Sequence, residues 1–78
     1  MTVIEAILTV LRDQKAPLSG AEILAEIRKR NLYSFKTKES LNVVRAQLRR
    51  HSEGYDRADA SSAKSIRQVT PDAYEALR

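Results

Sequence analysis

The chain has 78 residues, a formal net charge of +4 at pH 7, one histidine and no cysteine. This length predicts one small domain, residues 1–78, because a single core usually extends to about 100–150 residues before a second one forms. The lack of cysteine excludes disulfides, thiolate catalysis and cysteine-ligated zinc, and one histidine excludes a multi-histidine metal site. We therefore expect no enzyme with a buried active site, no cofactor and no metal.

No apolar run approaches the ~20 residues that a membrane-spanning helix needs, and no signal peptide precedes the first predicted helix. With 42% hydrophobic and 31% charged residues, the composition is typical of a folded chain. We expect no membrane partner and a cytoplasmic location, nucleoid-associated if the protein is bacterial.

Basic residues are concentrated in the middle of the chain. Residues 28–50 hold eight basic side chains and one acidic side chain, Glu39, whereas the remaining residues have a balance of −3. A surface that serves only solubility would intersperse the two signs more evenly. The distribution predicts a basic end of the molecule that faces a polyanion, and the alternative is an ordinary solvated face.

The first predicted helix spans about residues 3–14. Thr2 and Glu5 form a capping box before it, and apolar residues follow at helical spacing. Proline disfavours a helical conformation in the residue before it, so this helix should end ahead of Pro17. We expect Pro17-Leu18 to form a short stub at the edge of a sheet.

The second predicted helix opens on another capping box, Ser19 and Glu22, and ends near residues 30–31. Its inner face consists of Ile23, Leu24 and Ile27. Three large apolar residues then fill the corner between helices in our interpretation: Leu32, Tyr33 and Phe35. For Tyr33, stacking on a ligand is the alternative to core packing.

The third predicted helix spans about residues 38–51, with Thr37 as its candidate N-cap. Its inward stripe is Leu41, Val44 and Leu48. The opposite side carries Glu39, Asn42, Val43, Ala46, Arg49 and Arg50, flanked by Lys38 and Arg45. Arginine binds guanine bidentately, asparagine binds adenine, and small residues allow close approach to thymine methyl groups. The pattern is typical of a helix that reads the major groove of DNA.

An irregular connection at residues 52–63 leads to a predicted strand at residues 64–69. We expect Ile66 and Val69 to be its buried residues. Strict alternation places these two residues on opposite faces, so the strand needs a twist or bulge near Gln68.

Residues 70–72 read as a turn, and residues 73–77 as the returning strand, anchored by Tyr74 and Leu77. Three helices, a stub after the first helix and a terminal hairpin occur in this order in a winged helix-turn-helix. The predicted fold is therefore mainly α, with three helices and a small sheet of two or three strands.

The sequence resembles the HARE-type helix-turn-helix family. The resemblance rests on residues 32–38 (LYSFKTK), 43–51 (VVRAQLRRH), 16–18 (APL) and Tyr74, and extends over about residues 3–77. Members are known from restriction-system proteins, chromatin-associated regulators and an accessory subunit of bacterial RNA polymerase. The resemblance implies a DNA-binding module in transcription regulation or restriction, often fused at the N-terminus of a larger protein.

The hairpin departs from the family pattern. Ile66 takes the place of the usual phenylalanine, and the usual glycine is missing from the turn at residues 70–72. We therefore expect a short or irregular hairpin, in which Lys64 and Arg67 still reach phosphate.

The predicted function is binding of double-stranded DNA by the third helix in the major groove, with an associated or fused effector protein as a second partner. The candidate DNA contacts are Arg28, Lys29, Arg30, Lys36, Thr37, Lys38, Asn42, Arg45, Arg49, Arg50, Lys64 and Arg67. Lys36 and Thr37 would lie beside a helix N-terminus, where exposed N–H groups favour phosphate. The alternative is a protein-interaction winged helix without DNA binding, which would bury Val43 and Ala46 against another chain.

Two further features, a histidine and a pair of glutamates, are not expected to be catalytic. His51, at the end of the third helix, is expected to complement the helix dipole or to contact phosphate. Glu22 and Glu26 are spaced i, i+4 on the second helix, but nothing nearby supplies a nucleophile or metal ligand, so both are expected on a solvated surface.

Overall fold

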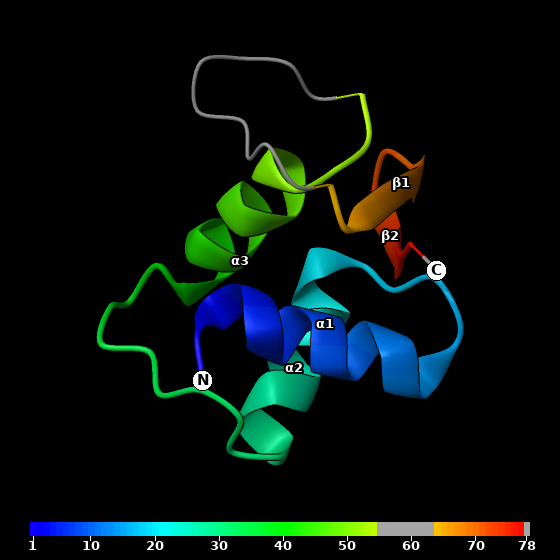
Figure 1. Cartoon of the computed structure of the whole chain (residues 1–78). Helices are drawn as coiled ribbons and strands as arrows, with labels where there is room; N and C mark the ends of the chain where they lie inside the picture. Colours follow the sequence, from blue (N-terminus) through cyan, green and yellow to red (C-terminus); the bar gives the residue numbers. More distant parts are fainter. Residues whose placement is uncertain (55–63, 78) are drawn as a thin grey trace.

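The structure, a computed structural model, describes residues 1–54 and 64–77. Its elements in chain order are α1 (Val3–Gln14), α2 (Gly20–Lys29), α3 (Ser40–Arg50), β1 (Ile66–Thr70) and β2 (Ala73–Ala76). The three helices cross one another, and the two strands form a hairpin beside them (Figure 1). The predicted mainly α fold with a small terminal hairpin is confirmed.

Both predicted capping boxes are present. The Thr2 amide donates to Glu5 Oε1 at 2.7 Å, and the Glu5 amide donates to Thr2 Oγ1 at 3.2 Å. The amides of Ser19 and Glu22 make the equivalent reciprocal bonds at 2.9 and 3.2 Å. Each box satisfies amides that have no partner inside the helix, so α1 and α2 begin where the sequence predicts.

The first two helices end in left-handed backbone. Lys15 has φ 57° and its amide bonds to the Leu11 carbonyl, whereas Asn31, just beyond α2, has φ 53°. Asparagine tolerates this conformation better than most residues, which agrees with the predicted end of α2 near residues 30–31.

The start of α3 differs from the prediction, because the helix begins at Ser40 rather than Lys38. Thr37 Oγ1 accepts from the Glu39 amide at 3.1 Å, and Ser40 Oγ donates to the Thr37 carbonyl at 3.0 Å. These bonds close a turn over residues 37–40, and local side-chain bonds of this kind compete with helix. Thr37 therefore caps a turn, and no side chain caps α3 itself.

The core lies where the helices and the hairpin meet. Its buried apolar residues are Ala6, Ile7, Val10, Leu11, Ile23, Leu24, Ile27, Val44, Leu48, Ile66 and Tyr74. The predicted inner faces of α2 and α3 are confirmed, with Leu41 partly buried. Leu32, Tyr33 and Phe35 pack against this core, and the Tyr33 and Phe35 rings meet edge-on with centroids 5.0 Å apart. Core packing is thus the observed role of Tyr33.

The hairpin is antiparallel and irregular, as expected. Its register pairs Ile66 with Ala76 and Gln68 with Tyr74, and then shifts between Gln68 and Thr70. The irregularity leaves Val69 outside the pairing and 47% exposed, so the prediction that Val69 is buried is wrong. The strand also begins at Ile66 rather than residue 64, because the Ser65 and Ile66 amides bond to the His51 carbonyl.

The expected stub also forms. The Leu18 amide donates to the Tyr74 carbonyl at 2.9 Å, and the Tyr74 amide donates to the Leu18 carbonyl at 2.8 Å. This bridge attaches the segment between α1 and α2 to the outer edge of β2. On the other side, Ser52 bridges to Ile66. Of the predicted connection at 52–63, residues 55–63 lie outside the described part.

Candidate nucleic-acid interface

α3 separates an apolar side from a polar side. Val44 and Leu48 are fully buried, whereas Asn42, Arg45 and Arg49 are exposed. Val43 and Ala46, predicted on the outer side, are partly buried rather than open to solvent. The apolar contacts that hold α3 against the core therefore turn amide and guanidinium groups outward.

α3 approaches the start of α2 closely at Gly20. A Cβ on this buried glycine would lie 3.2 Å from Arg45 Cγ and 3.7 Å from Leu41 Cδ1. The missing side chain makes room for the aliphatic part of Arg45, which holds this basic residue against α2. The sequence pattern at residues 19–22 predicts only a capping box, and the glycine after the N-cap serine is the available signal for the close approach.

The N-terminal end of α3 gathers several candidate residues. Arg28 Nη2 donates to Ser40 Oγ at 3.1 Å, which ties the end of α2 to the start of α3. Asn42 Nδ2 donates to Glu39 Oε2 at 2.7 Å, so the one acidic residue of the basic segment holds a predicted base contact. Exposed residues in the adjoining loop complete the group: Lys36, Thr37 and Lys38.

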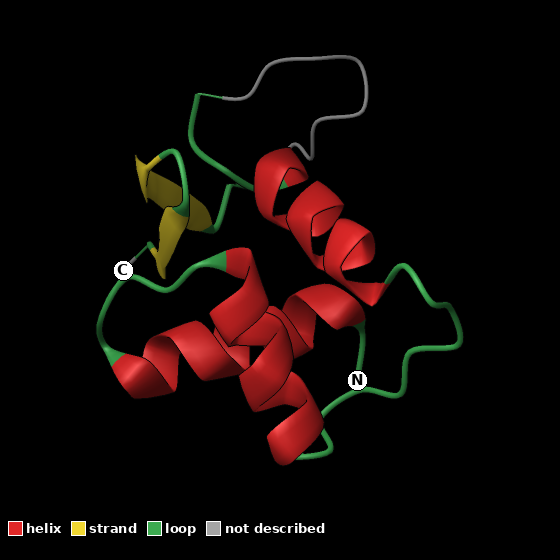
Figure 2. Ribbon diagram, turned by 180° about the vertical axis from the view of Figure 1, so that it is seen from behind, coloured by secondary structure: helices red, strands yellow, loops and turns green. Residues whose placement is uncertain are grey.

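The predicted contacts do not converge on one point. The C-terminal ends of α2 and α3 lie at opposite ends of the molecule, so the basic residues that end the two helices do not form one cluster (Figures 1 and 2). At the far end of α3, Lys64 Nζ donates to the Arg50 carbonyl at 3.3 Å. The basic residues thus extend along α3 from its N-terminal loop to its C-terminal end. There, His51 forms the C-cap, as its predicted position implied.

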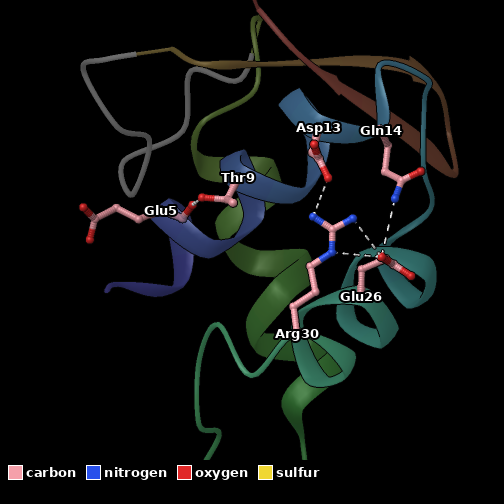
Figure 3. Close-up of polar contacts among 6 residues, drawn as sticks. All are labelled: Glu5, Thr9, Asp13, Gln14, Glu26 and Arg30. Atoms are coloured by element: carbon pink, nitrogen blue, oxygen red, sulfur yellow. Dashed lines mark hydrogen bonds and ion pairs between the residues drawn. The ribbon is translucent and has the colours of Figure 1, made fainter.

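Arg30 lies in a separate ion-pair cluster between α1 and α2 (Figure 3). Its Nη1 is 2.6 Å from Asp13 Oδ2, and its Nη2 is 3.1 Å from Glu26 Oε1. Gln14 Nε2 also donates to Glu26 Oε1, at 3.4 Å. The hydrogen bond that Arg30 donates to the Asp13 carboxylate raises the pKa of Arg30 above its ordinary value. Glu26 is therefore an ion-pair partner, which corrects the expectation that it is only solvated.

Arg67 on β1 is also held by carboxylates. Its guanidinium lies 3.7 Å from Glu53 Oε1 and 3.7 Å from Glu75 Oε2. These two ion pairs connect the segment after α3 to both strands of the hairpin.

Among residues 1–54 and 64–77, no helix has both the length and the apolarity needed to cross a bilayer. The same residues contain no group of three or more metal-ligating side chains placed to hold an ion.

A helix that crosses the start of its predecessor, presents polar residues outward and is followed by a β-hairpin defines a winged helix-turn-helix domain. The chain belongs to the HARE-HTH family, whose sequence profile matches residues 1–60 and whose description names ASXL and restriction endonuclease HTH domains. It is a family of DNA-binding helix-turn-helix domains. The match covers all three helices and ends before β1. No curated protein and no solved structure matches the chain.

Proposed function

We propose that this domain binds double-stranded DNA and that α3 enters the major groove. The observation that carries the proposal is the burial of Val44 and Leu48 opposite an exposed row of Asn42, Arg45 and Arg49, in a chain of a DNA-binding family. Arginine and asparagine are the side chains that bind guanine and adenine edges bidentately. Asn42 would give up its hydrogen bond to Glu39 and form hydrogen bonds to a base. The aliphatic part of Arg45 would stay packed against Gly20 while its guanidinium reaches the DNA.

Phosphate contacts flank this row in the proposed complex. Arg28, Lys29, Lys36, Thr37 and Lys38 would bind the backbone on the N-terminal side of α3, where helix amides that lack a side-chain cap also favour an anion. Arg50 and Lys64 would do so on the C-terminal side. Neutralisation of about four to six phosphates predicts that log K falls against log salt with a slope of roughly −4 to −5.

Arg30 and Arg67 receive a different role in this proposal. Each guanidinium lies between two carboxylates of its own chain, Asp13 and Glu26 for Arg30, and a phosphate would have to displace them. Both arginines are therefore proposed to brace the fold rather than to contact DNA.

The biological setting extends the proposal one step further. The family description names a restriction endonuclease domain, which supports a role in restriction or in transcription regulation, with a fused or associated effector acting on the bound DNA. The domain would supply the position on DNA, and the effector would supply the chemistry.

An NMR titration with a generic duplex tests the proposal. We expect amide shifts to cluster on residues 36–50, and to weaken together as salt is added. A duplex that moves no amides in this region would overturn the proposal in favour of the alternative, a protein-interaction winged helix, in which Val43 and Ala46 contact another chain.

A further inference from the structure

A groove lies between the end of α1 and β2. It has a volume of about 510 Å³, within the range of specific binding pockets. Its apolar lining consists of Leu11, Ala16, Ala76 and Leu77. The groove opens where the stub leaves β2: Leu18 pairs with Tyr74, but Lys15 turns the chain away before Ala16 can pair with Ala76.

The edge of β2 faces this groove with its backbone. In an antiparallel pair, successive residues direct their N–H and C=O groups to opposite sides of the strand. Tyr74 directs its groups to Leu18, and the Leu77 amide bonds back to Ser65 across the hairpin. Ala76 therefore directs its N–H and C=O groups outward, to the side where the stub has already diverged. An extended chain could pair there.

The charge at the groove is basic. Arg12 and Lys15 line it and are exposed, and within the described residues no ion pair engages either of them. Arg67 and Glu75 form the remaining charged wall and largely offset each other at 3.7 Å. A ligand in this groove thus meets two positive charges around an apolar floor.

The groove lies away from the proposed DNA-binding helix. The end of α1, the segment after it and the C-terminal residues lie on one side of the molecule, and α3 lies on the other (Figures 1 and 2). We propose that this groove binds an extended acidic segment of a partner protein, which adds to the β2 edge at Ala76, places an apolar side chain over Ala16 and Leu77, and pairs its carboxylates with Arg12 and Lys15. Such a segment could be held while α3 holds DNA.

The test uses the full chain and a defined probe, a capped peptide of eight alternating glutamate and valine residues. In NMR titrations we expect it to shift amides of residues 11–16 and 75–77 and to leave those of α3 in place. A matched lysine–valine peptide should not bind. Two further acidic peptides carry N-methyl groups on alternate backbone nitrogens, one on the odd and one on the even positions. One of the two should lose binding, because methylation removes the N–H donors that face β2 and are needed for strand pairing.

Two variants separate this proposal from DNA binding. The double substitution Arg12→Gln and Lys15→Gln should lower the affinity for the acidic peptide by roughly tenfold and leave the affinity for duplex DNA unchanged. Replacing Arg49→Glu and Arg50→Glu together should do the reverse. Equal binding of the lysine peptide, equal binding of both methylated peptides, or peptide shifts centred on α3 would each overturn the groove proposal, whatever the result with duplex. Duplex shifts centred on the groove would overturn it as well.

Discussion

Arg45 on α3 lies directly against Gly20 at the start of α2. The 3.2 Å that would separate its Cγ from a Cβ on Gly20 is closer than ordinary van der Waals contact. Gly20 is buried and opens α2, so this contact sets how near the two helices of the helix-turn-helix can come. The stability of the domain and the position of Arg45 therefore depend on the same glycine.

Substitutions at Gly20 should affect stability according to the size of the new side chain. Gly20→Ala should stay within about 1 kcal/mol of the parent, because Arg45 is flexible and alanine favours helix. Gly20→Val should cost about 1–3 kcal/mol through overpacking against Arg45 and Leu41, and should weaken duplex binding. Urea unfolding of the two variants checks this. Equal stability of both would show that α3 can shift away freely.

The capping box of α1 should make stability depend on pH. Hydrogen bonds from Thr2 lower the pKa of Glu5 in the folded protein. A carboxyl group with a lowered folded pKa contributes stability that is present above its unfolded pKa and lost as pH falls through the folded value. Thr2→Ala should cost about 0.5–2 kcal/mol at pH 7. Glu5→Gln removes the titrating carboxyl group and should lose less stability than the parent between pH 7 and pH 3, whereas Thr2→Ala keeps the backbone amide that donates to Glu5 Oε1.

Thermal unfolding at several pH values measures both effects. If Glu5→Gln and the parent were to lose stability in parallel on acidification, the Glu5 carboxyl group would not be a source of the pH dependence.

The sequence predicted best those features that depend on neighbouring residues. The capping boxes at Thr2 and Ser19, the turn at Asn31 and the apolar stripes of α2 and α3 all arise within a few positions of chain, and all are present. The stub was also predictable, because Pro17 ends a helix and leaves extended backbone.

Features that depend on distant partners were not predictable in the same way. The ion pair of Arg30 with Asp13 was not predictable because Asp13 lies 17 positions earlier, although Glu26, four positions before Arg30 on the same helix, was an available signal for the second ion pair. Val69 was predicted to be buried because it is apolar and lies in a strand. Only the pairing register across the hairpin shows that Val69 has no partner residue in β2. The start of α3 is a local exception: Thr37 and Ser40 lie three positions apart, and their hydroxyls form a turn that competes with the helix, which the helical pattern alone did not predict.

Removal of the acidic group at the start of α3 should strengthen DNA binding. Glu39 is exposed, repels phosphate and holds the Asn42 amide. We expect Glu39→Gln to raise duplex affinity severalfold, with a larger effect at low salt. Glu5→Gln removes the same charge, keeps a residue suited to the capping box and should change affinity little. Fluorescence anisotropy titrations measure the difference. Equal effects of the two substitutions would mean that only net charge matters.

Arg28 and Arg30, near the end of α2, should have different roles: Arg28 in DNA binding and Arg30 in stability. Arg30→Gln should lower the melting temperature, because it removes the ion pair with Asp13 that joins α1 to the end of α2 and the ion pair with Glu26 on α2. It should leave the salt slope of duplex binding unchanged. Arg28→Gln should reduce that slope by about 1 as one phosphate contact is lost. Melting curves and titrations on both variants decide the matter. A reduced slope for Arg30→Gln would return that residue to the DNA contacts.

The central claim is that α3 presents its basic side to DNA, and the salt dependence of duplex affinity tests it most directly. For the parent chain we predict a log–log slope of roughly −4 to −5. With Arg49→Glu and Arg50→Glu together, binding should be lost while the melting temperature stays nearly unchanged, because both side chains are exposed. A flat salt response in the parent, or normal duplex binding by this double variant, would contradict the account.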